Sequence, residues 1–377
     1  MIYFDHASTS RPKPLEVLEE IAAYMQTIGT SPGRGSYALA DAAHELIQEV
    51  RSKLAHLVNA ENPNQISFTH NATHAINIVL KGFLKQGDHV IISGFEHNAV
   101  VRPLHKLSSD GKITYDVWHP NTDGFFDLSL LEQMIRPNTA LIVLNHASNV
   151  LGVLSPVKEV GVLAHRLGIA LLVDVAQTAG IFSVDFANYA NYIAGTGHKS
   201  LLGPPGVGFL YVKDADTLST LYEGGSGLHS LSLFHPEIGP DKFESGTLNY
   251  MGIAGLKGSL SYIEKYGMDK LRQNIMLLTE QAICLLQKVP GLTLYGTQSL
   301  DHKVPLLSFT MKDFFANEIG YLLNQQAIAV RCGLHCAPLI HRRLGTLPQG
   351  TVRLSLGHQN TYEEINHFCD LLKGLYG

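Results

Sequence analysis

Short apolar runs alternate with amphipathic stretches through the middle of this chain, and this alternation limits the folds it can adopt. Several runs consist largely of Val, Ile and Leu, which is typical of strands covered on both faces. Strands joined through amphipathic segments need crossover connections and run mostly parallel. The expected strands are residues 65–69, 89–93, 112–117, 140–144, 170–174, 192–194 and 208–212. The pattern predicts an α/β fold built on a mostly parallel seven-stranded sheet.

The pattern changes after about residue 250, where a long helical stretch leads into shorter signals. These helical and strand signals are residues 253–266, 268–289, 306–311 and 352–356. Thr361 and Glu364 have the spacing of a capping box, which predicts that a last helix begins there. We expect a large domain at 15–250 and a smaller α+β domain formed by 1–14 and 251–377.

Composition excludes several classes of protein. The chain has 377 residues, of which 45% are hydrophobic, enough for a large core. Its 28 Lys and Arg against 33 Asp and Glu leave no basic surplus for nucleic acid. No apolar run reaches the roughly 18 residues of a membrane span, and the first residues do not resemble a signal peptide. Four cysteines are too few for a disulfide framework, so we expect a cytoplasmic protein. We also expect no metal site.

Polar residues that could bind a ligand or take part in catalysis follow two of the expected strands. Asp174 ends an apolar run and Gln177 follows it; a buried carboxylate is costly unless it meets a positive partner. Lys199 comes after a small-residue turn that contains Thr196 and His198. Taken alone, the Asp could cap a turn and the Lys could be a solvated loop charge. Together, they place an acid and an amine at the ends of two successive strands.

An amine, an acid and an anion cradle are what pyridoxal phosphate requires. The amine bonds to the aldehyde, the acid faces the pyridinium nitrogen, and backbone N–H groups with a hydroxyl hold the phosphate. A second cradle candidate lies at 68–77, where Ala72 and Thr73 open a helix after a strand. That signal alone is weak, because many helices open with ordinary polar caps.

The motifs as a set resemble the cysteine desulfurases of the class V aminotransferase family, which are fold-type I pyridoxal phosphate enzymes. In chain order they are YFDHAST (3–9), FTHNATHAIN (68–77), EHN (96–98), NVLG (149–152), VDVAQ (173–177), GTGHK (195–199), FESGTLN (243–249), RCGLHCAP (331–338) and RLSLGHQNTYEE (353–364). RCGLHCAP, the most specific of them, is similar to the short-loop desulfurases and selenocysteine lyases. In relatives the phosphate turn usually reads Gly-Thr-Thr, whereas here it is Asn71-Ala72-Thr73.

The resemblance implies a role for each matching residue around the cofactor. Lys199 would form the covalent bond to pyridoxal phosphate, and Asp174 would face the pyridinium nitrogen. Gln177 would contact the phenolic oxygen, and His97 would stack on the ring face and move a proton. The remaining cofactor-binding residues would be Ala72, Thr73, Asn149, Thr196, His198 and Thr247. Because Thr247 would reach the phosphate of a neighbouring subunit, the resemblance implies a homodimer with shared active sites.

The resemblance also implies the substrate site and the reaction. Asn149, Arg331 and Arg353 would hold the substrate, with Arg353 forming a bidentate pair to its carboxylate. Cys336 would act as a thiolate and take the sulfur of L-cysteine, leaving L-alanine and an enzyme persulfide. Cys332, four residues earlier, is either a second thiol that resolves the persulfide or a small buried residue.

Three other functions use parts of the same pattern. A selenocysteine lyase or another C–S lyase would share the cofactor site but use the thiol differently. A class V aminotransferase would need no cysteine at position 336. A non-catalytic assembly partner would not need Lys199, Asp174 and Arg353, which this chain keeps. A desulfurase of this kind would often work with a sulfur-acceptor protein, whose identity the sequence does not reveal.

Overall fold

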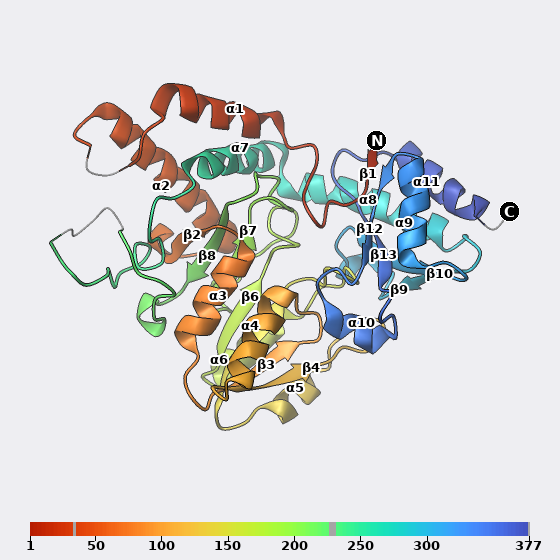
Figure 1. Cartoon of the computed structure of the whole chain (residues 1–377), viewed down its shortest axis with the longest axis horizontal. Helices are drawn as coiled ribbons and strands as arrows, with labels where there is room; N and C mark the ends of the chain where they lie inside the picture. Colours follow the sequence, from red (N-terminus) through yellow and green to blue (C-terminus); the bar gives the residue numbers. More distant parts are fainter. Residues whose placement is uncertain (33–34, 226–230, 376–377) are drawn as a thin grey trace.

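The computed structural model describes residues 1–32, 35–225 and 231–375. A seven-stranded sheet forms the centre of the larger part, in the order β2-β8-β7-β6-β5-β3-β4 (Figure 1). Its strands are β2 (Ile66–Thr69), β3 (His89–Ser93), β4 (Thr114–Trp118), β5 (Thr139–Asn145), β6 (Ala170–Asp174), β7 (Tyr192–Thr196) and β8 (Gly208–Val212). The prediction of an α/β fold with a mostly parallel seven-stranded sheet is confirmed.

One strand, β8, runs against the others. It pairs antiparallel with both β2 and β7, whereas the ladders from β7 across to β4 are parallel. A parallel connection needs a crossover of about a dozen residues or more, usually helical. Residues 197–207 contain no helix and turn back directly, so β8 must return antiparallel. This turn holds Lys199 close to the end of β7.

Helices cover both faces of the sheet. They are α1 (Leu15–Ala23), α2 (Ala38–Val58), α3 (Ala72–Phe83), α4 (Asn98–Ser109), α5 (Leu128–Met134), α6 (Val157–Arg166) and α7 (Tyr250–Tyr266). Alternate residues of β5 show the two faces: Leu141 and Val143 pack with α3 and α4, while Ile142 and Leu144 pack on the side of α2, α6 and α7. Burial on both sides explains the nearly continuous apolar runs of these strands.

The smaller part has its own sheet and core. Its sheet has the order β12-β13-β10-β9, and a separate pair joins β1 to β11 in parallel. The elements are β1 (Ile2–Tyr3), α8 (Met268–Leu286), β9 (Leu292–Tyr295), β10 (Leu306–Met311), α9 (Ala316–Gln325), β11 (Ile328–Ala329), β12 (Arg331–Gly333), α10 (Pro338–Leu344), β13 (Thr351–Ser355) and α11 (Tyr362–Gly374). The first and the last element, β1 and α11, both lie in this part (Figure 1). The capping box of Thr361 and Glu364 at the start of α11 is confirmed.

The division of the chain near residue 250 stays a prediction, and one helix bears on it. The expected small domain includes α7, but the buried residues of α7, among them Ile253 and Leu260, belong to the core of the larger part. The second core takes its first α8 residue at Ile275. By packing, α7 therefore extends the larger part. Within the described ranges, no helix is both long and apolar enough to cross a membrane.

Candidate active site

A cavity of about 280 Å³ opens at the carboxyl ends of β5, β6 and β7. Open α/β sheets commonly bind ligands at this edge. Nine of the predicted site residues line the cavity: Ala72, Thr73, His97, Asn149, Asp174, Gln177, Thr196, His198 and Lys199. The structure therefore brings residues from across more than a hundred positions of sequence to one place.

Asp174 and Lys199 supply opposite charges to this cavity. Asp174 is the last residue of β6 and is buried; its Oδ1 accepts a hydrogen bond of 2.8 Å from the Ala176 amide. Burial raises the pKa of Asp174, and the neighbouring Lys199 partly opposes that shift. Burial also lowers the pKa of the Lys199 amine, with Asp174 opposing. A lowered amine pKa leaves more of the neutral form, which is the form that attacks an aldehyde.

The side of the cavity formed by α3 and the turn after β7 has the donors of an anion site. Ala72 and Thr73 open α3, where the first N–H groups have no partner within the helix and the helix dipole is positive. Thr196 is buried, and its Oγ1 has no hydrogen-bond partner among the described residues. An orphaned hydroxyl that lines a cavity beside a helix N-terminus fits a phosphate group.

Two histidines in the cavity are neutral near physiological pH. Burial, followed by the charge of Lys199, lowers the pKa of both His97 and His198 to about 4. His97 caps α4, and its Nδ1 accepts a hydrogen bond of 3.0 Å from the Ala99 amide. Nδ1 therefore carries no proton, which puts the single ring proton of His97 on Nε2. His97 can thus donate a hydrogen bond from Nε2.

Gln177 has a partner that the sequence did not indicate. Its Nε2 donates a hydrogen bond of 3.1 Å to the carbonyl of Ala7, in the N-terminal segment. The Ser200 hydroxyl donates to the Gln177 carbonyl at 3.0 Å. These contacts fix Gln177 between the N-terminal segment and the turn of Lys199.

The loop that carries Cys336 lies next to the cavity and is tied to its wall. The Asn149 Nδ2 donates 2.6 Å to the carbonyl of His335, and the Asn98 amide donates 2.7 Å to the carbonyl of Cys336. His335 and Cys336 both have positive φ, at 47° and 57°. Residues other than glycine keep this backbone only when the surroundings enforce it, and such strain is concentrated at functional sites. Cys336 itself is exposed.

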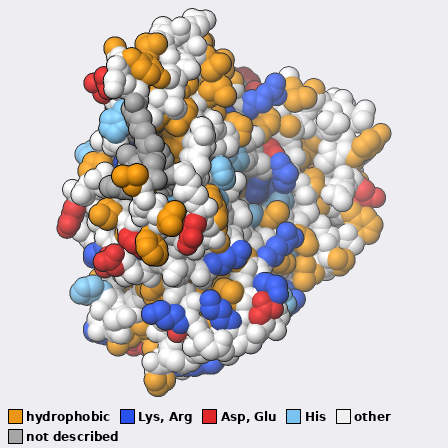
Figure 2. Space-filling model, turned by 60° about the vertical axis from the view of Figure 1, so that its left-hand side comes forward, with side chains coloured by type: hydrophobic (Ala, Val, Ile, Leu, Met, Phe, Trp, Pro, Cys, Tyr) orange, Lys and Arg blue, Asp and Glu red, His pale blue; other side chains and the backbone are white. Residues whose placement is uncertain are grey.

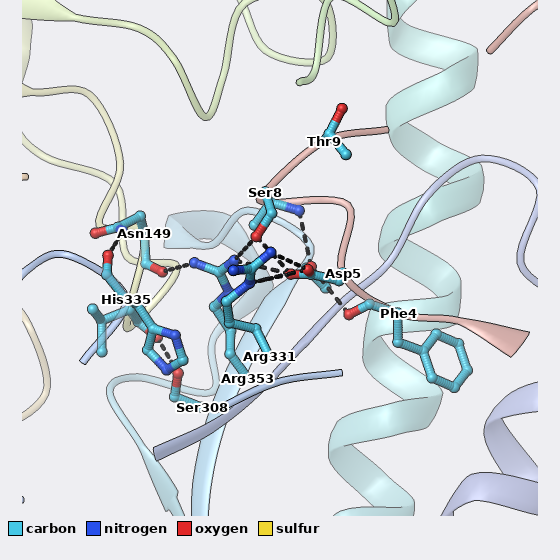
Figure 3. Close-up of polar contacts among 12 residues, drawn as sticks. Phe4, Asp5, Ser8, Thr9, Asn149, Ser308, Arg331, His335 and Arg353 are labelled. Atoms are coloured by element: carbon cyan, nitrogen blue, oxygen red, sulfur yellow. Dashed lines mark hydrogen bonds and ion pairs between the residues drawn. The ribbon is translucent and has the colours of Figure 1, made fainter. Parts of the chain in front are cut away.

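Asp5 contacts both of the predicted substrate arginines, Arg331 and Arg353 (Figure 3). The sequence did not indicate this role of Asp5. Arg331 donates to both Asp5 oxygens, the shortest contact being 2.7 Å from Nη2, and Arg353 Nη2 lies 3.1 Å from Oδ1. Burial alone would raise the pKa of Asp5, but hydrogen bonds from Arg331 and Ser8 and the charge of Arg353 outweigh it and lower the pKa. Two guanidinium groups share one carboxylate, so one positive charge remains for a ligand.

The remaining contacts of Arg353 bear on the expected bidentate pair. Nη1 donates 3.0 Å to the Asn149 carbonyl, and Nη2 also donates 2.7 Å to the Ser8 hydroxyl. Nε is buried and has no partner among the described residues. Both hydrogens of Nη2 are thus engaged. A guanidinium pairs bidentately with a carboxylate either through Nη1 and Nη2 or through Nε and Nη2, so both arrangements need Nη2. A bidentate pair with a ligand would require Asp5 or Ser8 to release that nitrogen.

Thr247 does not reach the cavity of its own chain. It is exposed in the segment that precedes α7, and the hollow it helps to line contains Tyr222 and His74 rather than Asp174 or Lys199. Its expected contact with the phosphate of another subunit stays a prediction.

Lys, Arg and His side chains gather near the junction of the larger and the smaller part (Figure 2), a charge distribution that attracts anionic ligands.

Cys332 has the surroundings of a structural residue. It lies half-buried on β12, and its sulfur is so close to α9 that a Cβ added at Gly320 would be 2.5 Å from it. Burial raises the pKa of the Cys332 thiol to about 11. A thiol with that pKa supplies little thiolate at neutral pH. These contacts favour the interpretation of Cys332 as a small packed residue over that of a second reactive thiol.

Known proteins share both the sequence and this arrangement. The family described as Aminotransferase class-V matches residues 2–368. A probable cysteine desulfurase of Methanothermobacter thermautotrophicus is 34% identical over all of this chain and 95% of that protein. A cysteine desulfurase of Escherichia coli is 32% identical over all of this chain and 93% of that protein. The apo structure of a cysteine desulfurase from Thermococcus onnurineus has a TM-score of 0.94 at 30% identity, covering 99% of this chain and 94% of that one.

Proposed function

The chain belongs to the class V aminotransferase family, and we propose that it is a pyridoxal phosphate-dependent cysteine desulfurase that converts L-cysteine to L-alanine. The observation that carries this proposal is the exposed Cys336 beside a cavity that contains Lys199 and Asp174. The Asn98 amide holds the carbonyl of Cys336, and the Asn149 side chain holds the carbonyl of the preceding His335. An aminotransferase has no use for a thiol at this position. The named relatives, a probable cysteine desulfurase and a cysteine desulfurase, support the same activity.

The residues of the cavity fit pyridoxal phosphate. Its volume, about 280 Å³, is near the lower end of typical ligand pockets, which begin at about 300 Å³. Lys199 would hold the aldehyde carbon, the buried Asp174 would face the ring nitrogen, and the start of α3 with the orphaned Thr196 hydroxyl would hold the phosphate. When bound, the cofactor supplies an electron sink for bond cleavage at the substrate carbons.

Asp174, Lys199 and Arg353 would then each have a task in the reaction. Asp174 would favour a protonated ring nitrogen in the bound cofactor, since a buried carboxylate is stabilised by a cation beside it. The Lys199 amine, once free, removes the proton from the substrate α-carbon and later returns a proton. Arg353, with the positive charge that Asp5 leaves uncompensated, binds the substrate carboxylate.

Sulfur transfer falls to Cys336. Its thiolate attacks the substrate sulfur, so that a sulfur–sulfur bond forms while the bond between that sulfur and the substrate β-carbon breaks. The electron pair of the broken bond passes to carbon, which takes up a proton and becomes the methyl group of alanine. Cysteine and the enzyme thiol thus yield alanine and an enzyme persulfide. A sulfur-acceptor protein would then take the terminal sulfur.

The test of this function compares L-cysteine, L-cystine and L-selenocysteine side by side. With L-cysteine and a thiol reductant, we expect alanine and sulfide in equal amounts, because each turnover moves one sulfur atom. Cleavage of selenocysteine alone would favour a selenocysteine lyase, and pyruvate with ammonia would favour another C–S lyase. Amino-group transfer to a keto acid without release of sulfur would favour an aminotransferase.

Asp5 offers a prediction about substrate binding. Asp5→Asn removes the charge that Arg331 and Arg353 share, and leaves two guanidinium groups to repel each other. Asp5→Asn would also release Nη2 of Arg353, but loss of one partner of a partly buried ion pair costs about 2–5 kcal/mol. We expect the resulting displacement of the two guanidinium groups to outweigh the gain, so that the KM for cysteine rises about tenfold or more. Asp313→Asn, which removes an exposed charge in the same part of the chain, is the control. An unchanged KM in Asp5→Asn would show that Asp5 does not position the arginines.

A homodimer with shared sites is part of the proposal. Thr247 is exposed and away from its own cavity, and the nearby side chains of Leu231, Leu233, Phe234 and Ile238 are all at least 79% exposed. Such a cluster is typical of a contact surface. We expect light scattering to report a dimer at micromolar concentration. A fully active monomer would contradict the shared site.

The four cysteines, all in described segments, are free, which supports the reducing cytoplasm as location.

A further inference from the structure

A turn of the larger part, residues 148–153, is fastened to the smaller part through four successive backbone carbonyls. Each carbonyl accepts one hydrogen bond from a donor beyond residue 300. The donors are Arg353 Nη1 to Asn149 at 3.0 Å, Ser308 Oγ to Val150 at 2.5 Å, Lys303 Nζ to Leu151 at 2.8 Å and the Val304 amide to Gly152 at 2.7 Å. The turn approaches so closely that a Cβ at Gly152 would lie 2.6 Å from the Leu306 carbonyl.

Lys303 is the unusual member of this set. Its side chain is completely buried, and its second acceptor is the carbonyl of Thr297 at 2.9 Å. Among the described residues, no carboxylate forms an ion pair with this amine, and burial lowers its pKa to about 7. A buried ammonium without a counter-ion is costly. Its hydrogen bonds to the carbonyls of Leu151 and Thr297 are the interactions that offset this cost.

The turn that Lys303 holds also supports the Cys336 loop. Val150 and Leu151 pack in one buried cluster with Phe95, Ala337 and Ile340. Ala337 directly follows Cys336, and Phe95 lies two residues before His97. From the same turn, the side chain of Asn149 donates to the carbonyl of His335. A shift of the turn would therefore reach both the cavity wall and the strained backbone of residues 335–336.

We propose that Lys303 is a positioning residue for sulfur transfer: by holding the Leu151 carbonyl it fixes the turn at 148–153, and through Asn149 and the Ala337 cluster it fixes the Cys336 loop. The inference rests on the proposed function, because it assigns Lys303 a part in that reaction. Ser308, which donates to the adjacent carbonyl and is fully buried, acts in the same way.

The test uses the full-length holoenzyme and three lysine variants. Lys303→Met removes the hydrogen bonds, Lys303→Arg keeps a cation with donors, and Lys288→Met changes an exposed lysine of the smaller part. Hydrogen exchange is measured by mass spectrometry on peptides that cover 148–154 and 333–338. In Lys303→Met we expect exchange there to rise about tenfold or more, while α8 and the sheet of the larger part stay unchanged. Lys303→Arg should restore most of the protection, and Lys288→Met should match the wild type.

Kinetics give a second readout. A displaced nucleophile costs about 10²-fold in rate, so Lys303→Met should lower kcat for desulfuration far more than it changes the KM for cysteine. Unchanged exchange at both peptides would overturn the proposal, as would a uniform rise over the whole chain with normal kcat per folded site. If Lys303→Met does not fold, Ser308→Ala takes its place under the same criteria. The exchange result does not depend on activity: an inactive wild type would refute the proposed function, while the exchange data would still decide whether Lys303 holds these two segments.

Discussion

Replacing Lys199 with alanine is expected to abolish turnover of cysteine, by at least about 10³-fold. Lys199 is the cavity-lining amine whose pKa burial lowers, opposite the buried Asp174. Without it, the chain loses both the covalent link to pyridoxal phosphate and the base at the substrate α-carbon. The protein should stay folded, and the visible absorbance of the bound cofactor should be lost or shifted. Assay of alanine and the absorbance spectrum measure the two effects.

Lys13 is the matched control for this result. Its amine also lies near the turn, donating 2.8 Å to the His198 carbonyl, and burial lowers its pKa to about 8. Borohydride reduction of the wild type, followed by peptide mapping, should place the cofactor adduct on Lys199 and not on Lys13. An adduct on Lys13, or substantial turnover by Lys199→Ala, would show that the assignment of the cofactor lysine is wrong.

Changing Cys336 to alanine should separate the two halves of the reaction. Neither cofactor attachment nor carboxylate binding uses the thiol, so the absorbance spectrum and its response to cysteine should remain. Release of sulfur from cysteine should fall by about 10²-fold or more, since no other described thiol combines exposure with a place beside the cavity. Cleavage of selenocysteine could survive, because a selenolate leaves more readily than a thiolate.

Two other cysteines serve as controls for that experiment. Cys284 is exposed on α8, outside the 331–338 motif that carries Cys336. Cys332 is half-buried on β12, and the pKa of its thiol is raised. Alanine at either position should leave desulfuration within about twofold, the range of ordinary surface or small-volume changes. If Cys332→Ala loses activity while Cys336→Ala keeps it, the roles of the two thiols are reversed. Full activity in both variants and in the double variant would rule out a persulfide mechanism.

The apolar runs were enough to predict the sheet, because a strand that is buried on both faces is apolar at nearly every position. Residues 89–93, 170–174 and 208–212 form strands with the expected ends. The direction of β8 was not indicated, since it depends on the short turn after β7 and not on the strand itself. The packing of α7 on the larger part was also missed: its apolar stripe shows that it is buried, but not against which partner.

The candidate site was predictable where a motif carries the chemistry. Asp174, Lys199 and Cys336 stand at strand ends or in a short loop, and the first two line one cavity. Asp5 and Lys303 were missed because their roles depend on partners more than a hundred residues away. A signal for Asp5 existed, since an acid within the apolar start of the chain needs a cation. Lys303 directly follows Asp301 and His302, so the sequence does not distinguish it from an ordinary exposed lysine.

Transfer of sulfur from cysteine onto Cys336 is the step that defines the proposed activity. The most direct measurement is mass spectrometry of the holoenzyme after incubation with L-cysteine in the absence of any acceptor or reductant, with alanine assayed in the same sample. We expect the peptide containing Cys336 to gain the mass of one sulfur atom, with one alanine formed for each modified site. Cys284 and Cys332 should remain unmodified. Alanine formed without added sulfur on Cys336, or added sulfur on another cysteine alone, would contradict the proposed transfer.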